Sequence, residues 1–253
     1  MSDPAAKETP WSERDSATFL DLGRYYVPQR DLQIATVCGA IPAPPASSRG
    51  GPAHMVELCC GEGLLAAALL HRFPTATVHA LDGSDAMLAA TARRLASHGG
   101  RFETRKFDLP SSAWRRFPWP VHAIVSSLAI HHLSAAEKRQ LYADMAGCLA
   151  PGGALVICDL VETLTAEGRR LFAEAWDDGV RRACVEIDGD LRGFDRFRAD
   201  DWNFYAMKQP DPIDKPDPLF DQLKWFEAAG LEKIEVHWLV AGHAIFSGRK
   251  KAG

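Results

Sequence analysis

Two adjacent cysteines, Cys59 and Cys60, lie in a glycine-containing loop, VELCCGEG, that includes and follows the end of an apolar run. A thiolate in this place could act as a nucleophile, a metal ligand or half of a redox pair. The six cysteines of the chain, however, include no Cys-x-x-Cys pair and no cysteine/histidine array with zinc spacing. We therefore expect reduced cysteines that pack as small apolar side chains, and no bound metal.

Three acidic residues form a second pattern around the same loop. Glu57 leads into it, Asp82 closes the next apolar run (VHALD), and Asp108 closes the one after that (RKFDLP). Gly61 and Gly63 let the backbone approach a ligand, and the helix that follows offers unpaired N–H groups. At the ends of parallel strands, Asp82 can accept from the hydroxyls of a ribose and Asp108 from the amino group of an adenine.

The elements that would position these residues alternate along residues 54–160. Apolar runs bounded by Gly, Pro, Asp or Ser predict strands, and stretches with helical spacing lie between them. Ser84 and Ser134 are suitable N-cap residues for two of the helices. After Gly230, an Ala-Gly turn joins two further strands into an antiparallel hairpin. We expect a Rossmann-like, doubly wound α/β fold with a seven-stranded sheet, an antiparallel C-terminal hairpin, N-terminal helices and a helical insertion.

These features resemble the motifs of the class I S-adenosylmethionine (SAM)-dependent methyltransferases. The family's loop reads roughly acidic-Leu-Gly-Cys-Gly-x-Gly, and this chain has ELCCGEG from Glu57 to Gly63. The match covers about residues 54–160 and the C-terminal hairpin, which separates this fold from dehydrogenase Rossmann folds. Cys59 stands where the family has its first glycine, so we expect its side chain to crowd the pocket beside the methyl donor.

The resemblance implies that SAM is the cofactor and S-adenosylhomocysteine the product. Glu57 would anchor the loop, Asp82 would bind the ribose, and Met87 would flank the adenine. An aromatic or basic residue of the N-terminal segment would hold the SAM carboxylate. The expected cofactor contacts are Glu57, Leu58, Cys59, Gly61, Gly63, Asp82, Gly83, Met87, Asp108, Leu109, Ser126, Tyr26 and Arg30.

Composition and the resemblance together divide the chain into four segments. Residues 1–52 predict an N-terminal helical segment and a linker, and residues 53–160 predict the SAM-binding core. Residues 161–218 are too long for a plain connection and predict a helical insertion that serves as a substrate lid. Residues 219–253 predict a helix and the hairpin that completes the core.

The acceptor side is less well defined by the sequence. Methyl transfer from a sulfonium is an in-line SN2 displacement, in which positioning and the exclusion of water supply much of the catalysis. A base is needed only where the acceptor must lose a proton. His131, ahead of its neighbour His132, and His243 are the candidate catalytic residues; ordering of a loop or turn is the competing role. The candidate substrate contacts are Tyr25, Trp176, Arg181, Trp202, Tyr205 and Trp238.

Bulk properties limit the function classes. A formal charge of −4 and a pI near 6.1 give no electrostatic footprint for nucleic acid. No apolar run approaches the length that spans a bilayer, and the N-terminus has no apolar secretory segment. We expect a cytoplasmic monomer or homodimer.

The favoured function is SAM-dependent methylation of a small molecule held under the helical lid. The main alternative is an RNA- or tRNA-modification enzyme of the wobble-uridine or carboxy-SAM-synthase type, which shares the layout of core, insertion and hairpin. A non-catalytic SAM-fold protein is a third reading, although Asp82 and Asp108 are both present. A dehydrogenase is the weakest, because the G-x-G-x-x-G spacing is missing.

Overall fold

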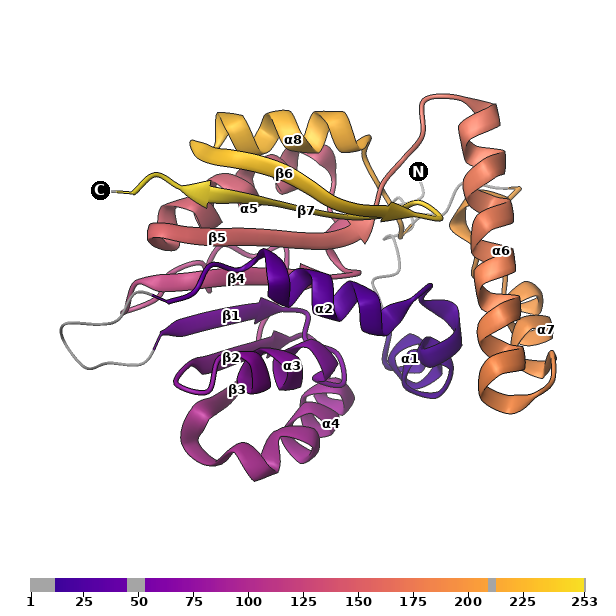
Figure 1. Ribbon diagram of the computed structural model, residues 1–253, viewed down its shortest axis with the longest axis horizontal. Helices are drawn as coiled ribbons and strands as arrows, with labels where there is room; N and C mark the ends of the chain where they lie inside the picture. Colours follow the sequence, from indigo (N-terminus) through magenta and orange to yellow (C-terminus); the bar gives the residue numbers. More distant parts are fainter. Residues whose placement is uncertain (1–11, 45–52, 209–212, 253) are drawn as a thin grey trace, which may run out of the picture.

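The structure is a computed structural model that describes residues 12–44, 53–208 and 213–252. Its strands are β1 (His54–Leu58), β2 (Thr77–Asp82), β3 (Phe102–Lys106), β4 (Val121–Ser127), β5 (Leu149–Leu160), β6 (Leu231–Val240) and β7 (His243–Lys250). They form one seven-stranded sheet in the order β3-β2-β1-β4-β5-β7-β6 (Figure 1). The first five strands are parallel, and β7 pairs antiparallel with both β5 and β6. The predicted Rossmann-like fold with a terminal hairpin is confirmed.

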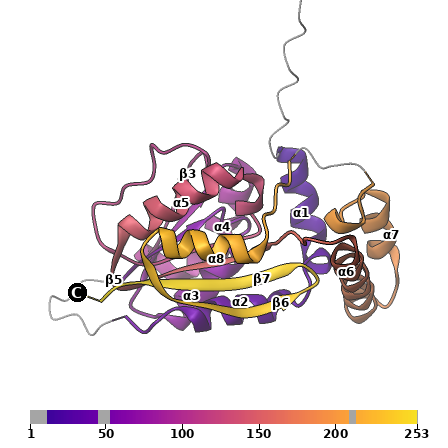
Figure 2. The ribbon, with the colours of Figure 1, turned by 90° about the horizontal axis from the view of Figure 1, so that it is seen from above.

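Helices cover both faces of this sheet (Figure 2). They are α1 (Glu13–Tyr26), α2 (Arg30–Ala40), α3 (Leu64–Arg72), α4 (Asp85–Leu95), α5 (Ala135–Cys148), α6 (Ala166–Asp188), α7 (Arg192–Ala199) and α8 (Leu219–Ala228). Leu69 of α3 packs on one face in a cluster with Val125, and Phe226 of α8 packs on the other in a cluster with Ile124. Successive strand residues point to opposite faces, so β4, which is buried along all but its last residue, lies between two helical layers. Among the described residues, no helix has both the length and the apolar composition needed to cross a bilayer.

Serine side chains begin three of these helices. Ser84 Oγ accepts a hydrogen bond from the Met87 N–H at 3.1 Å at the start of α4. Ser134 forms a capping box with Glu137 at the start of α5, and Ser12 forms one with Asp15 at the start of α1. The N-caps predicted at Ser84 and Ser134 are confirmed, because a side-chain acceptor here satisfies N–H groups that the helix cannot.

Strand β5 begins at Leu149, ahead of the Pro-Gly-Gly stretch that precedes its apolar run ALVICDL. Leu149 pairs with Val121, and the register of β4 and β5 then shifts before Ala123 meets Ala154. Gly153 lies within this irregularity, where a Cβ would come within 2.9 Å of the His122 carbonyl oxygen. Gly152 and Gly153 therefore allow an irregularity inside β5, which the sequence pattern alone would read as two separate segments.

The segment after β5 leaves the sheet and returns beside its own starting point, where Glu162 forms a parallel bridge with Pro218. Within it, α6 and α7 lie with α1 beyond the carboxyl ends of the parallel strands (Figure 1). Trp176 of α6 donates from Nε1 to the Tyr26 carbonyl at 2.7 Å. Tyr205 donates its hydroxyl to the carbonyl of Val161 at 2.7 Å or to that of Gly242 at 2.9 Å. These bonds tie the segment to the N-terminal helix and to the hairpin turn.

Candidate active site

A cavity of about 660 Å³ lies at the carboxyl ends of β1, β2 and β4. Strand order reverses here, since β2 and β4 flank β1, and open α/β sheets bind ligands at such a point. The volume falls within the roughly 300–1,000 Å³ that is typical of small-molecule sites. The walls come from α1, α2, the loop after β1, the ends of β2 and β3, and the turn after β4.

Glu57, at the end of β1, lines this cavity although its side chain is almost fully buried. The backbone N–H of Ala66 donates to its carboxyl group, while Oε2 has no hydrogen-bond partner among the described residues. Burial raises the pKa of Glu57 to about 8 from an ordinary value of 4.5, against the lowering effect of nearby Arg30. Arg30 lines the same cavity and donates to Ser127 Oγ at 2.7 Å. A buried acid and a guanidinium together suit a ligand with an amino-acid end.

Asp82 joins the loop after β1 to the end of β2. Its Oδ2 accepts from the Gly61 N–H at 2.8 Å and its Oδ1 from the Ser84 N–H at 2.9 Å. Burial raises the pKa of Asp82 in spite of these hydrogen bonds. Each carboxylate oxygen can accept a second hydrogen bond, so Asp82 can still bind hydroxyl groups of a ligand. Gly63 completes the loop with φ of 80°, and a Cβ there would meet Thr91 Oγ1 at 2.9 Å.

Cys59 adopts φ of 56°, the left-handed conformation, which non-glycine residues rarely adopt. Its half-buried side chain lines the large cavity. Burial first, and then the negative charges of Asp82 and its neighbours, raise the pKa of the Cys59 thiol well above 9.0. The thiol is therefore neutral at physiological pH, which argues against a nucleophilic role.

A second cavity of about 170 Å³ lies beside the first, under α6 and the chain that follows α7. Phe19, Leu128 and Ile213 line both cavities and form the wall they share. Trp176 and Trp202 of the 161–218 segment line only the smaller one. Two ligands, one bound in each cavity, would therefore approach one another at this wall.

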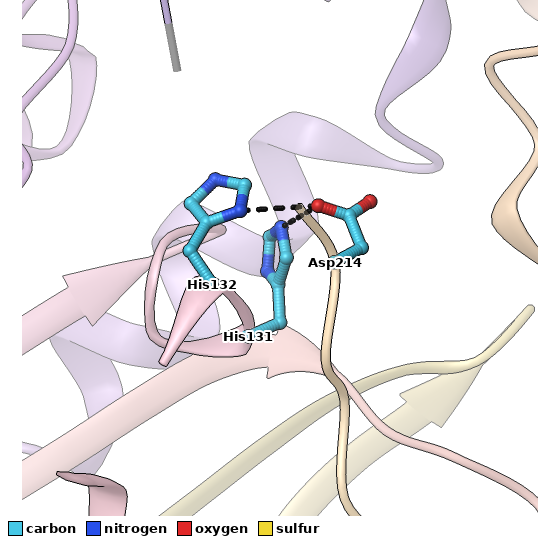
Figure 3. A group of neighbouring side chains, drawn as sticks. All are labelled: His131, His132 and Asp214. Carbon is cyan, nitrogen blue, oxygen red and sulfur yellow. Dashed lines mark ion pairs between the residues drawn. The ribbon is translucent and has the colours of Figure 1, made fainter. Parts of the chain in front are cut away.

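Two histidines and two aspartates form a partly buried network between the cavities, and Figure 3 shows three of them, His131, His132 and Asp214. His131 Nδ1 donates to Asp159, which also accepts from the Ile130 N–H at 2.6 Å. His131 Nε2 lies 3.4 Å from Asp214 Oδ1, and His132 Nδ1 lies 3.0 Å from the same oxygen. Burial alone would lower the pKa of His131, but the two carboxylates outweigh it and raise the pKa to about 10.

The two histidines consequently differ in protonation. His131 is charged at neutral pH and has no nitrogen lone pair to accept a proton. Burial and the positive charge of His131 lower the pKa of His132, so this ring is neutral. With Asp214 accepting from Nδ1–H, the lone pair of His132 is on Nε2, and His132 lines the large cavity. The geometry suits His132 for accepting a proton.

The same ring nitrogens and the Asp214 carboxylate lie within 4.8 Å of one another, the only such group of metal-ligating type found among the described residues. The Asp159–His131 hydrogen bond would also suit a metal ligand, since metal-bound histidines commonly donate their other N–H to a carboxylate. In the arrangement seen, however, the Asp214 carboxylate lies between the two rings and neutralises the charge of His131. With both carboxylates ionised and only His131 charged, the network keeps one net negative charge.

Comparison with known proteins shows similarity to methyltransferases. A family model described as a methyltransferase domain matches residues 55–153. The trans-aconitate 2-methyltransferase of Acidovorax sp. (strain JS42) is 29% identical over 201 residues, which cover 73% of this chain and 70% of that protein. The ribosomal protein L11 methyltransferase of Xylella fastidiosa (strain 9a5c) is 32% identical over 143 residues, which cover 56% of this chain and 42% of that protein. These matches and the observed sheet support a class I SAM-dependent methyltransferase.

A solved O-methyltransferase family protein from Burkholderia thailandensis shares the fold of this methyltransferase, with a TM-score of 0.63 and 17% identity. The similarity covers 96% of this chain and 61% of that one, so the chain spans about three-fifths of the solved protein's length. At this identity the likeness concerns the fold alone.

SAM is the methyl donor of this family, and the larger cavity fits it. The spare oxygen of buried Glu57 suits an ammonium group, and Arg30 suits a carboxylate, as the methionine part of SAM requires. Asp82 keeps free acceptor capacity for hydroxyl groups such as those of a ribose. Ser84 donates from Oγ to Glu13 Oε2 at 2.8 Å, which holds α1 across this end of the cavity.

Most of the expected cofactor contacts come together in the large cavity. Its lining includes Arg30, Glu57, Cys59, Gly61, Asp82, Gly83, Met87, Asp108 and Leu109. Three others support the loop from outside the lining. Leu58 is in the core, Ser126 donates to the Leu58 carbonyl at 3.1 Å, and Gly63 packs against Thr91. Tyr26 lines the smaller cavity instead.

The expected acceptor-side residues separate into two groups. Trp176, Trp202, His131 and His243 line the smaller cavity. Tyr25 bonds to Asp188, Arg181 pairs with Asp178 on the surface, Tyr205 bonds to backbone carbonyls, and Trp238 packs against the core; none of these four lines either cavity. Burial lowers the pKa of His243 to about 4, and its Nδ1 bonds to the Ala241 carbonyl.

Sequence reasoning gave no weight to Asp214, Phe19, Leu128 or Ile213. Asp214 comes from a proline-rich stretch more than 80 residues from His132, and no local signal links the two. His132 was visible in the sequence, but only its surroundings separate it from His131. These residues are brought together by the return of the 161–218 segment along the turn after β4, where the Lys215 N–H donates to the His131 carbonyl at 2.7 Å.

Replacing Cys59 with glycine should strengthen SAM binding by about threefold, or roughly 0.7 kcal/mol. Glycine tolerates the left-handed conformation and removes a side chain from the cavity wall. Isothermal titration calorimetry with SAM measures the effect, and Cys59→Ala is the matched control because it removes the sulfur and keeps the strained Cβ. An affinity identical to that of the native chain would make Cys59 a neutral replacement.

Proposed function

We propose that this methyltransferase methylates a small molecule that binds in the 170 Å³ cavity, with residues 161–218 acting as a lid. The observation that carries the proposal is the shared wall of Phe19, Leu128 and Ile213 between this cavity and the SAM-binding one. When bound, SAM supplies an electrophilic methyl group on a sulfonium. The protein's part is then to hold an acceptor atom at this wall and keep water away.

The lid proposal rests on the contacts of the described part of 161–218. Trp176 and Trp202 cover the smaller cavity, and the Trp176 indole is bonded to α1 through the Tyr26 carbonyl. Tyr205 bonds to the carbonyl of Gly242 in the hairpin turn, which fixes the other side. This network encloses the acceptor cavity with apolar rings, an arrangement that excludes water.

For an acceptor that must lose a proton, we propose His132 as the general base. Its neutral ring and its bond to Asp214 leave Nε2 to take the proton. His131, charged between Asp159 and Asp214, would orient the Asp214 carboxylate and stay protonated. His243, buried and neutral, would shape the cavity against the edge of Trp176, 4.6 Å between ring centroids.

The enclosed, aromatic acceptor cavity supports a small molecule over RNA, whose recognition needs an open basic surface. The first relative's name, trans-aconitate 2-methyltransferase, also refers to a small molecule, whereas the ribosomal protein L11 methyltransferase is named for a protein. A cytoplasmic location and a monomeric or dimeric state stay predictions from the sequence.

The test is to incubate the enzyme with methyl-tritiated SAM and separate bacterial fractions: a metabolite ultrafiltrate, RNA and protein. The proposal expects label transfer in the ultrafiltrate alone, and saturating S-adenosylhomocysteine as the control should abolish it. Label found only in RNA or protein would replace the small-molecule reading with a macromolecular one.

A further inference from the structure

The charged side chains that line the smaller cavity are mostly acidic. Its lining includes Asp15, Asp200, Asp201 and Asp214, and no Lys or Arg side chain of the described residues is part of it. The acids come from α1, from the chain after α7, and from the segment that returns to the core. This convergence of separate elements on one cavity is decided by the tertiary structure.

The neighbouring cations offset only part of this charge. Arg196 pairs with Asp200, and Asp214 lies between His131 and His132. The Asp15 carboxylate accepts from the N–H and hydroxyl of Ser12, which carry no charge. Within the described parts of the chain, no ion pair involves Asp201. The cavity therefore keeps an excess of negative charge.

Four aromatic rings also line the cavity, namely Phe19, Tyr26, Trp176 and Trp202. The rings of Tyr26 and Trp202 lie 5.1 Å apart at an angle of 51°. Tyr26 is fully buried, and its hydroxyl has no hydrogen-bond partner among the described residues. An unpaired buried hydroxyl is costly, and a hydrogen-bonding group of a ligand would satisfy it.

We propose that the acceptor carries a positive charge, as an amine or a quaternary ammonium group, which the acidic and aromatic side chains of this cavity bind. Aromatic faces attract cations, and carboxylates beside them add both charge and hydrogen bonds. This inference rests on the proposed function, because it assigns the small cavity to the acceptor. A polycarboxylate such as trans-aconitate would face four aspartates here without a lysine or arginine partner.

The test uses the full chain saturated with S-adenosylhomocysteine and three probes that differ in charge. Tyramine is the cationic probe, 4-ethylphenol is its neutral analogue, and 3-(4-hydroxyphenyl)propionate is the anionic one, with trans-aconitate added for comparison. Calorimetry should show tyramine binding at least about tenfold more tightly than either anion, equivalent to roughly 1.4 kcal/mol. Added salt should weaken tyramine binding.

Two variants make the test specific. Asp201→Asn should weaken tyramine binding several-fold, whereas Asp178→Asn, an exposed aspartate of α6 outside the cavity, should leave it unchanged. Tyr26→Phe should also weaken tyramine binding while leaving the melting temperature the same or higher, since the hydroxyl has no partner in the free protein.

Equal or tighter binding of an anion, no measurable tyramine binding, or equal effects of the two asparagine variants would each overturn the proposal. If S-adenosylhomocysteine does not bind, the proposed function is overturned as well. If it binds but tyramine does not, only the positively charged acceptor is overturned, so the same calorimetry distinguishes the two failures.

Discussion

Replacing Glu57 with glutamine should weaken SAM binding by about 10- to 100-fold, because a hydrogen bond to a charged group contributes about 1.5–3 kcal/mol. Glutamine keeps the shape of the side chain and an oxygen for the Ala66 N–H, and it removes the negative charge that an ammonium group would meet. Calorimetric titration with SAM measures the loss. Glu103→Gln, an exposed position on β3, is the matched control and should bind SAM as the native protein does.

The raised pKa of Glu57 adds a signature that a merely structural role would not produce. At pH 7 the free carboxyl, with a pKa of about 8, is largely protonated. A bound ammonium favours the carboxylate, so SAM binding should release a proton, seen as a dependence of the binding enthalpy on the ionisation enthalpy of the buffer. The Glu57→Gln variant should lose this proton release. A native affinity in the variant, with proton release retained, would contradict the assignment.

The same shift predicts how stability depends on pH without SAM. The folded protein holds this proton up to about pH 8, whereas the unfolded chain releases it near 4.5. Rising pH between these values therefore favours unfolding, and the free energy of unfolding should fall. Glu57→Gln should flatten this part of the pH profile, as measured by urea denaturation at a series of pH values.

Replacing His132 with glutamine should lower kcat by about 100-fold or more for an acceptor that must lose a proton, since a general base contributes roughly 10²–10⁴. The loss of kcat should exceed any loss of SAM affinity, although His132 lines the SAM-binding cavity. The rate is measured with tritiated SAM and the ultrafiltrate that supports turnover. In the native enzyme kcat should rise with pH through the pKa of His132, which lies below 6.5, and level off at neutral pH; the variant should lack this limb.

Asp214→Asn separates positioning from base catalysis. It keeps a hydrogen-bond acceptor near His132 Nδ1 and removes one of the two carboxylate charges that raise the pKa of His131, while Asp159 retains the larger effect. We expect a smaller loss of kcat than in His132→Gln, with SAM affinity retained. Native activity in His132→Gln would rule out the base. A loss of activity in EDTA that zinc restores would instead identify His131, His132 and Asp214 as metal ligands.

The fold could be predicted from sequence because its signals are local. Alternating apolar runs, serine caps and an Ala-Gly turn each depend on a few adjacent residues, and all of them agree with the sheet observed. The boundary of β5 could not be predicted, because its first residues pair with Val121 across an irregularity that depends on the neighbouring strand. Packing partners at long range decided that detail.

The same division holds for the site. The sequence by itself determined the cofactor loop, since Glu57, Gly61 and Asp82 are placed by their positions at strand ends, and it marked Cys59 as unusual before its left-handed conformation was known. Only the tertiary structure decided which histidine is charged and which is neutral, because a pKa depends on burial and on nearby charges such as Asp214. It alone brought four aspartates and four aromatic rings from distant segments to one small cavity, and with them a preference for positive charge that no local pattern contains.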